Sequence, residues 1–567
     1  NLTQVRADRN GVIQVLSDKG LLQPHAGAFL YPGTIESDPN YLPMADKDIS
    51  NMDLYKHHFV YLDDEAVLSN AWSGKLFSEH EMSGAEIFAG GKDFMFLVSD
   101  GRNLRLIRDS EILWKGKLSD QIIDIKCTSG DNQFWILGHN TLATFNPENQ
   151  KLKTIFRGND FRAFDLAGFN SKTIIGTGNG YIEINNLKEE QSSKIHREIP
   201  CPEITVVKEI NGHLWFGSPN GAFMLRDNGE FNYYYGERWL PGNKVLDIAE
   251  GPDRSVLILT EKGLGRICFE KMTLKEKAMY FEQQVRQRHI RYGFNATLSG
   301  LDQGNLSTGH LSTSDNDGLW TGMYLGSQVF RYAVTHSEEA LQNCRASLEA
   351  MERLYTINPV SGFPSRSFER SGYKDSEEWQ DAPDPEWDWK ATTSSDEAIG
   401  HIFALGAFAE LIDAKSLRTK AVNLIDRLMQ HIIDNNLYLV DYDGKPTTWG
   451  RWNPEYVNAR PKMVGDRKLN SSNIIAMLQT AYHFTGKNIY KEKAFELMHE
   501  HSYLENLMRP MEKIGRAPDT ADDWSKMLSK SWNHSDDEMY YMGYWGLFRY
   551  AFNDTLKNKY KKAIMDH

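Results

Sequence analysis

A repeat of about 40 residues fills the first half of the chain and constrains its fold more than any other feature. The clearest copy is HLWFGSPNGAFML, from His213 to Leu225, in which two short apolar stretches flank a polar turn with glycine. Further copies surround six positions: Gly20, Asp64, Gly101, Asn140, Gly180 and Gly263. Glycine or asparagine suits such turns because the favoured two-residue hairpins need positive φ. Seven units of this length predict a seven-bladed β-propeller with one four-stranded sheet per blade.

The pattern changes to helical periodicity from Leu274 onward. Four apolar helices are expected, each opened by a small polar cluster and each followed by a more charged helix; their segments begin at Ser312, Thr392, Asn470 and Trp532. Apolar helices belong inside and amphipathic helices outside, so the alternation predicts concentric layers of helices. The expected fold class is therefore multidomain β + α, with a propeller over residues 1–270 and an (α/α)6-type toroid over residues 271–567.

Composition excludes several classes of partner. The chain of 567 residues has a net charge of -13 with interspersed charges, so it lacks the basic stripe that nucleic acid requires. No apolar run approaches the roughly 20 residues that span a bilayer, and we expect no membrane span. Four widely separated cysteines form no CxxC pair, which favours buried free thiols over a zinc or redox site. An acidic oligosaccharide or polysaccharide remains an eligible substrate, because a site needs only a few local cations.

The polar clusters at the helix starts have two interpretations. Short polar side chains and acids cap helix N-termini, and capping explains many of these residues. In a toroid, however, the N-terminal ends of the inner helices open onto the same face. We therefore predict a cleft where these clusters converge.

The loops between the predicted helix pairs are rich in groups that bind and activate sugars. Uronate β-elimination needs a base, an acid and a cation or strong donor for the carboxylate. Our candidates are His401 or Tyr373 as base, and His310 or His534 as acid. The predicted substrate-binding residues, with Arg366, Arg451 and Asn473 assigned to the carboxylate, are Arg366, Arg370, Arg451, Trp452, Asn470, Asn473, Trp320, Trp532 and Asn533.

A propeller joined to a helical toroid, with the motifs TSSDEAIGH from Thr393 and SDNDGLW from Ser314, resembles a group of gut-bacterial polysaccharide lyases. Those enzymes cleave L-rhamnose from D-glucuronate in arabinogalactan side chains. The resemblance covers the whole chain at the level of architecture and is most specific in the toroid motifs. It implies a β-elimination that releases rhamnose and leaves an unsaturated uronic acid.

Two rival functions stay open. A glycoside hydrolase or unsaturated-uronyl hydrolase on the same toroid would use a carboxylate pair, for which Asp317 and Glu397 are the natural candidates and Asp537 or Glu538 the alternates. Capping explains the same acids. The other rival is a non-enzymatic sensor or glycan-binding propeller protein, since propellers host binding, sensing and catalysis alike.

Neither a cofactor nor an obligatory metal is expected. Asp315 and Asp317 have the D-x-D spacing of a calcium loop, but the distal glutamate of an EF-hand is absent, and a calcium ion on these oxygens stays an open alternative. The chain begins at Asn1, which fits a mature or truncated chain. From the expected function we infer a secreted, periplasmic or cell-surface bacterial protein.

Overall fold

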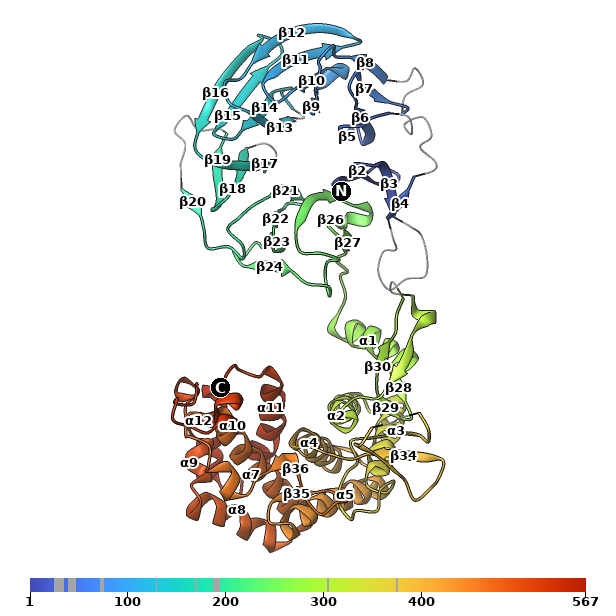
Figure 1. Ribbon diagram of the computed structural model, residues 1–567, viewed down its shortest axis with the longest axis vertical. Helices are drawn as coiled ribbons and strands as arrows, with labels where there is room; N and C mark the ends of the chain where they lie inside the picture. The colour runs from blue at the N-terminus through green and yellow to red at the C-terminus, as the bar shows by residue number, and fades with distance from the viewer. Residues whose placement is uncertain are drawn as a thin grey trace. The chain divides into compact units, whose positions relative to one another are not determined.

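The computed structural model describes residues 1–24, 35–38, 47–71, 76–128, 130–168, 171–186, 194–302, 305–373 and 376–567. The chain divides into two compact units (Figure 1), one formed by Asn1–Met272 with Asp302–Ser307 and the other by Thr273–Leu301 with Thr308–His567. Among the described residues, no helix has the length and apolar character needed to cross a membrane.

Seven antiparallel sheets build the described part of the N-terminal unit, and their strands follow one another in chain order. Within each sheet, the strand that comes first in the sequence lies at one edge and the strand that comes last lies at the other. The sheets are β1–β4 (Leu2–Ala7, Ile13–Ser17, Gly20–Pro24, Ile35–Ser37), β5–β8 (Asn51–Tyr55, His58–Leu62, Ala66–Ser69, Leu76–Glu79), β9–β12 (Ile87–Gly90, Phe96–Ser99, Asn103–Arg108, Glu111–Lys117), β13–β16 (Ile122–Cys127, Phe134–Gly138, Thr141–Asn146, Lys151–Arg157), β17–β20 (Phe161–Ala167, Lys172–Thr177, Gly180–Asn185, Ile195–His196), β21–β24 (Val206–Ile210, His213–Ser218, Gly221–Leu225, Phe231–Tyr234) and β25–β27 (Val245–Glu250, Val256–Thr260, Gly263–Ile267).

The sheets are arranged as the blades of a propeller (Figure 1). The ring closes where β1 lies beside β25, and there the Val5 amide donates to Asp247 Oδ2 at 3.0 Å. Val5 and Leu257 share one apolar cluster, so the first and last blades also bury a common core. The repeat copy at Gly221 forms the hairpin β22–β23, and Gly221 has φ 102° with the Tyr234 carbonyl where a Cβ would stand. The seventh blade has three strands among the described residues instead of the predicted four.

Four antiparallel helix pairs form most of the second unit. They are α2 (Asp317–Thr335) with α3 (Glu338–Leu354), α4 (Ser395–Leu411) with α5 (Lys415–Asp434), α7 (Gly465–Thr485) with α8 (Asn488–Glu500), and α11 (His534–Arg549) with α12 (Asp554–Asp566). Each predicted apolar segment supplies the first helix of a pair. The (α/α)6 ring requires six pairs and the described residues form four, so a closed toroid stays a prediction.

Further helices, 3-10 turns and short strands lie outside these pairs. The remaining helices are α1 (Leu274–Arg288), α6 (Pro454–Val457), α9 (Tyr503–Leu507) and α10 (Asp523–Leu528), with 3-10 turns at Lys92–Phe94, Pro252–Arg254, Leu306–Thr308 and Met511–Lys513. The strands are β28 (Ile290–Arg291), β29 (Phe294–Asn295), β30 (Thr297–Ser299), β31 (His310–Ser312), β32 (Ser367–Arg370), β33 (Trp379–Asp381), β34 (Trp387–Lys390), β35 (Tyr438–Val440) and β36 (Pro446–Arg451).

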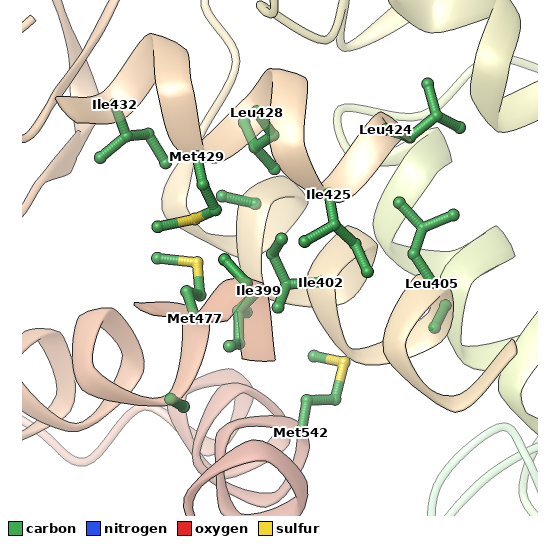
Figure 2. Packing of buried hydrophobic residues seen from close by; sticks show 14 of the residues in the cluster. Ile399, Ile402, Leu405, Leu424, Ile425, Leu428, Met429, Ile432, Met477 and Met542 are labelled. Atoms are coloured by element: carbon green, nitrogen blue, oxygen red, sulfur yellow. The ribbon is translucent and has the colours of Figure 1, made fainter. Parts of the chain in front are cut away.

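The core of the helical unit lies around α4. This helix contacts α2, α5, α7 and α11, and it is apolar on all sides, as a central helix must be. Figure 2 shows side chains of α4 and α5 interdigitating, with one methionine each from α7 and α11 beside them: Ile399, Ile402, Leu405, Leu424, Ile425, Leu428, Met429, Ile432, Met477 and Met542. This packing brings the N-terminal ends of the central helices to one end of the unit.

Candidate active site

Four carboxylates gather at the N-terminal ends of three central helices. Asp396 lies in the first turn of α4 and Asp466 in that of α7, while Asp536 and Glu538 begin α11. Their charges interact, because Asp466 and Asp396 both act on Asp536, and Asp396 acts on Glu538. These four residues are called the carboxylate cluster below. The starts of α4, α7 and α11 thus lie close enough for their carboxylates to interact, and the predicted cleft stays a prediction.

The pKa values of all four carboxyl groups in the cluster are raised. Burial and the neighbouring charges of Asp466 and Asp396 raise the pKa of Asp536 from 3.8 to about 7. Burial raises the pKa of Asp466 to about 6 and also raises the pKa values of Asp396 and Glu538. One buried oxygen each of Asp466 and Glu538 has no hydrogen-bond partner in the described part of the chain. Such groups are poised to exchange protons with a ligand.

The start of helix α2 and the segment before β32 contribute polar side chains next to Asp396. Asn316, the residue before α2, donates from Nδ2 to Asp396 Oδ2 at 3.5 Å. Arg366 Nη2 donates to Asn316 Oδ1 at 3.1 Å, and its charge lowers the pKa of Asp396 against the effect of burial. Arg366 is held because its backbone amide donates to the Lys390 carbonyl at 2.8 Å. Its Nε is buried and has no hydrogen-bond partner among the described residues.

Two tryptophans of this unit are partly exposed. Trp320 is 39% exposed and lies one turn after Asn316 on α2, where it lines a cavity of about 260 Å³. The same cavity contains the side chain of Asn295, whose buried Oδ1 lacks a partner in the described residues. Trp532 is 38% exposed, and its Nε1 donates to Asp537 Oδ2 at 3.1 Å. Exposed aromatic faces of this kind offer platforms for sugar rings.

Asp317, predicted for a hydrolase, lies beneath this surface. It is fully buried, its Oδ2 pairs with Arg291 Nη2 at 2.7 Å, and its Oδ1 accepts from the Ser314 amide at 3.0 Å. Ser367 also donates to it. These contacts hold the start of α2 in place, so the role of Asp317 is structural.

Glu397 and His401 are likewise fully buried. Glu397 Oε2 lies 3.3 Å from His401 Nε2, and His401 Nδ1 lies 2.8 Å from the Tyr355 hydroxyl. Glu397 Oε1 accepts from the Leu319 amide at 3.3 Å. A Cβ at Gly318 would strike both Glu397 and His401, so this glycine lets α2 approach α4 closely. The predicted base is thus locked between helices in this structure.

The other predicted catalytic groups are not brought together. Tyr373 is 78% exposed on the loop after β32, His310 begins β31, and both lie on the surface. His534 is exposed at the start of α11, with Nδ1 3.3 Å from Asp537 Oδ2. Of the four predicted catalytic residues, His534 is the one that adjoins the carboxylate cluster, through the first turn of α11.

The predicted substrate-binding residues divide between structural and accessible positions. Trp452 is fully buried, and Asn470 donates to the Asp466 carbonyl within α7. Arg370 pairs with Glu386 at 2.7 Å on the surface.

Two further predicted binders lie at the end of a strand or helix, and a third lies in the middle of α7. Arg451 donates from Nε to the Thr447 carbonyl at 2.7 Å, and Asn533 caps α11 by accepting from the Ser535 amide. Asn473 is buried, and its side-chain Nδ2 and Oδ1 have no hydrogen-bond partner among the described residues.

Asp396, Asp466 and Asp536 were not among the predicted site residues. All three stand in first turns of helices, where acids are common for electrostatic reasons alone. The signal that distinguishes them is their proximity to each other, and this proximity exists only after the helices pack.

The described residues contain no group of three or more His, Cys, Asp or Glu side chains placed to hold a metal ion. The oxygens with D-x-D spacing are engaged otherwise, because Asp315 pairs with Lys390 and Asp317 with Arg291.

Neither a protein-family model nor a curated protein matches the chain. Among solved structures, the extracellular domain assigned to a hybrid two-component system of B. thetaiotaomicron is 15% identical, with a TM-score of 0.38, over 48% of this chain and 38% of that one. The match thus spans about two fifths of that protein. Virginiamycin B lyase from Staphylococcus aureus is 12% identical, with a TM-score of 0.37, over 47% of this chain and 95% of its own. No function is inferred from similarities at this level.

Proposed function

We propose that the helical unit is a carbohydrate-active hydrolase that cleaves a glycosidic bond with the carboxylate cluster. The observation that carries this proposal is the convergence of Asp396, Asp466 and Asp536 from three helix starts, where the pKa of Asp396 is raised and those of Asp466 and Asp536 reach about 6 and about 7. The four helix pairs would belong to an α/α toroid, whose open end is the usual place for such a cleft.

In this mechanism Asp536 is the general acid. With a pKa of about 7 it holds a proton at neutral pH and can donate it to the departing glycosidic oxygen. Asp396 is the carboxylate that acts on the sugar or on water; burial raises its pKa, and the charge of Arg366 acts in the opposite direction and favours the ionised form. The carboxyl groups titrate as a coupled set, so a proton on Asp536 also favours ionisation of Asp396.

Recognition of the sugar would come from the surroundings of the cluster. Trp320 and Trp532 offer exposed aromatic faces. A polymeric glycan does not cross a bacterial membrane, so this function would place the protein in the periplasm or at the cell surface.

β-Elimination at a glucuronate is the second candidate, including cleavage of terminal L-rhamnose-α-1,4-D-glucuronate linkages. Arg366 favours it, because a guanidinium with a free Nε can neutralise a uronate carboxylate. Four carboxylates around one such cation weigh against it, since they repel an anionic sugar unless protonated.

One assay separates the two reactions. The protein is incubated with gum arabic, a rhamnosyl-glucuronate oligosaccharide and a panel of neutral and acidic glycans, and free sugar is measured together with ultraviolet absorbance of a new conjugated double bond. Sugar release without absorbance supports the hydrolase, and release with rising absorbance supports the lyase.

The variants Asp536→Asn and Asp396→Asn test the residues. Each is expected to lower kcat at least a hundredfold, roughly the contribution of one acid or base. Asp554→Asn is the matched control, because Asp554 also stands in the first turn of a helix but is exposed and outside the cluster. Full activity in Asp536→Asn, with the control also active, would overturn the assignment.

A further inference from the structure

A cavity of about 260 Å³ is lined by residues from the end of α1 and the start of α2. His289, the residue after α1, lines it together with Asn295 of β29 and Thr297 of β30. Ser314 and Trp320 line it from the start of α2. We call this space the α1–α2 cavity. It belongs entirely to the helical unit.

Hydrogen bonds among the lining residues and their neighbours fix the shape of the α1–α2 cavity. His289 Nδ1 lies 3.1 Å from the Ala296 carbonyl, and the Ala296 amide donates to the His289 carbonyl at 2.8 Å. The Asn295 amide donates to Thr321 Oγ1 at 3.1 Å, which ties β29 to α2 at the residue after Trp320. A site that is formed before its ligand arrives loses less conformational entropy on binding. The cavity is therefore preorganised.

The α1–α2 cavity combines an aromatic face with uncharged hydrogen-bonding groups. The Trp320 ring is partly exposed. His289 Nδ1 faces a carbonyl, so it carries the ring hydrogen, and Nε2 is an acceptor in the neutral imidazole. Asn295 Oδ1 is a buried acceptor without a partner among the described residues, and Thr297 adds an exposed hydroxyl. This combination suits a sugar, because a pyranose ring has an apolar face that stacks on aromatic rings and hydroxyl groups around its edge.

The lining of the α1–α2 cavity is uncharged. No lysine, arginine, aspartate or glutamate side chain lines it in the described part of the chain, and the remaining lining residues, Val285 and Ala296, are apolar. A uronate carboxylate placed here would lose hydration without gaining a counter-ion, which is strongly unfavourable. The cavity therefore favours a neutral sugar over an acidic one.

A short path of hydrogen bonds joins the α1–α2 cavity to the carboxylate cluster. Ser314 Oγ accepts from the Asn316 amide at 3.1 Å, and Asn316 Nδ2 donates to Asp396 Oδ2 at 3.5 Å. Trp320 lies one turn after Asn316, where its amide donates to the Asn316 carbonyl at 3.1 Å. The cavity and Asp396 therefore both adjoin the start of α2.

We propose that the α1–α2 cavity binds one neutral sugar residue of the glycan that the carboxylate cluster cleaves. This proposal rests on the proposed function for the link to cleavage, whereas binding in the cavity does not require cleavage. The cavity is smaller than the roughly 300–1,000 Å³ typical of sites for whole small molecules, so it holds a single ring. Trp320 stacks on the sugar, while His289, Asn295 and Thr297 bind its hydroxyl groups. The substrate class is then a glycan with a neutral sugar close to the cleaved bond.

The experiment is isothermal titration of the full chain with the methyl glycosides of glucose, galactose, rhamnose and arabinose, and with the methyl glycoside of glucuronic acid. The glucoside and the glucuronoside are a matched pair, because they differ only in the group at C6. At least one neutral glycoside is expected to bind, about tenfold or more tightly than the glucuronoside, because the carboxylate has no counter-ion in the cavity. Absence of binding by every neutral glycoside overturns the proposal, and so does a glucuronoside that binds as tightly as the best neutral probe.

Two variants locate the binding. Trp320→Ala should weaken binding of the neutral glycoside about tenfold, because it removes the stacking face. Thr297→Phe changes an exposed position and should abolish binding by filling the cavity. Tyr280→Ala is the matched control, because Tyr280 is an exposed aromatic residue of α1 that does not line the cavity. Unchanged binding in both cavity variants overturns the proposal, since the probe then occupies another site.

Activity assays on the same variants separate this proposal from the proposed function. Binding of a neutral glycoside that both cavity variants lose, in a chain that cleaves no glycan, would overturn the hydrolase and keep the binding site. Cleavage of a glycan with KM unchanged in Trp320→Ala and Thr297→Phe would keep the hydrolase and overturn the binding site.

Discussion

Asp536→Asn is expected to stabilise the protein while it abolishes activity. The carboxyl of Asp536 has a folded-state pKa of about 7, against 3.8 in the unfolded chain, so ionisation is disfavoured by folding. A group with a raised folded pKa contributes its stability below the unfolded pKa, and that contribution is lost as the pH rises from about 4 to 7. Asparagine cannot ionise and avoids this loss.

The magnitude follows from the pKa difference. Each pH unit between 3.8 and about 7 lowers the free energy of unfolding by roughly 1.4 kcal/mol, or about 4 kcal/mol in all for a group titrating alone. Asp466 and Asp396 share the repulsion and relax when one charge is removed, so about 2 kcal/mol is expected for the substitution. In a domain of this size that is a rise in Tm of about 5 °C at pH 8.

The assay is thermal unfolding of Asp536→Asn and the unmodified protein at pH 4 and pH 8. The gain in Tm should be present at pH 8 and nearly vanish at pH 4, where both chains are uncharged at this position. Asp537→Asn is the control: hydrogen bonds from Trp532 and His567 lower the pKa of Asp537, so this variant should lose stability at pH 8. Equal Tm values for Asp536→Asn and the unmodified protein at pH 8 would refute the reasoning.

Three further predictions test the surroundings of the site. His401→Ala should lower the free energy of unfolding by about 2–4 kcal/mol in urea, because it strips a buried partner from Tyr355; loss of activity without loss of stability would instead restore His401 as the base. Asp317→Asn should cost about 3 kcal/mol in the same measurement by leaving Arg291 buried without its main counter-ion, and an unchanged unfolding midpoint would contradict this. Trp320→Ala should raise KM roughly tenfold at unchanged Tm, since its exposed ring is free to stack on a sugar; an unchanged KM would exclude it from the site.

Local patterns in the sequence were sufficient to predict the two kinds of architecture. The repeat with glycine at its turns corresponds to hairpins such as β22–β23, where Gly221 adopts a positive φ. The four apolar segments after residue 310 became α2, α4, α7 and α11, each beginning near its polar cluster. Such features depend on neighbours in the chain, because hydrophobic period and turn geometry are set over a few residues.

The choice among the candidate site residues was decided by tertiary structure. Glu397 and Asp396 are adjacent in sequence, as are Asp537 and Asp536, yet one member of each pair joins the carboxylate cluster and the other binds buried or surface partners. Successive residues on a helix point about 100° apart. Which of them joins the cluster depends on how α4, α7 and α11 pack, and that packing also produces the burial and the mutual repulsion that raise the pKa of Asp536.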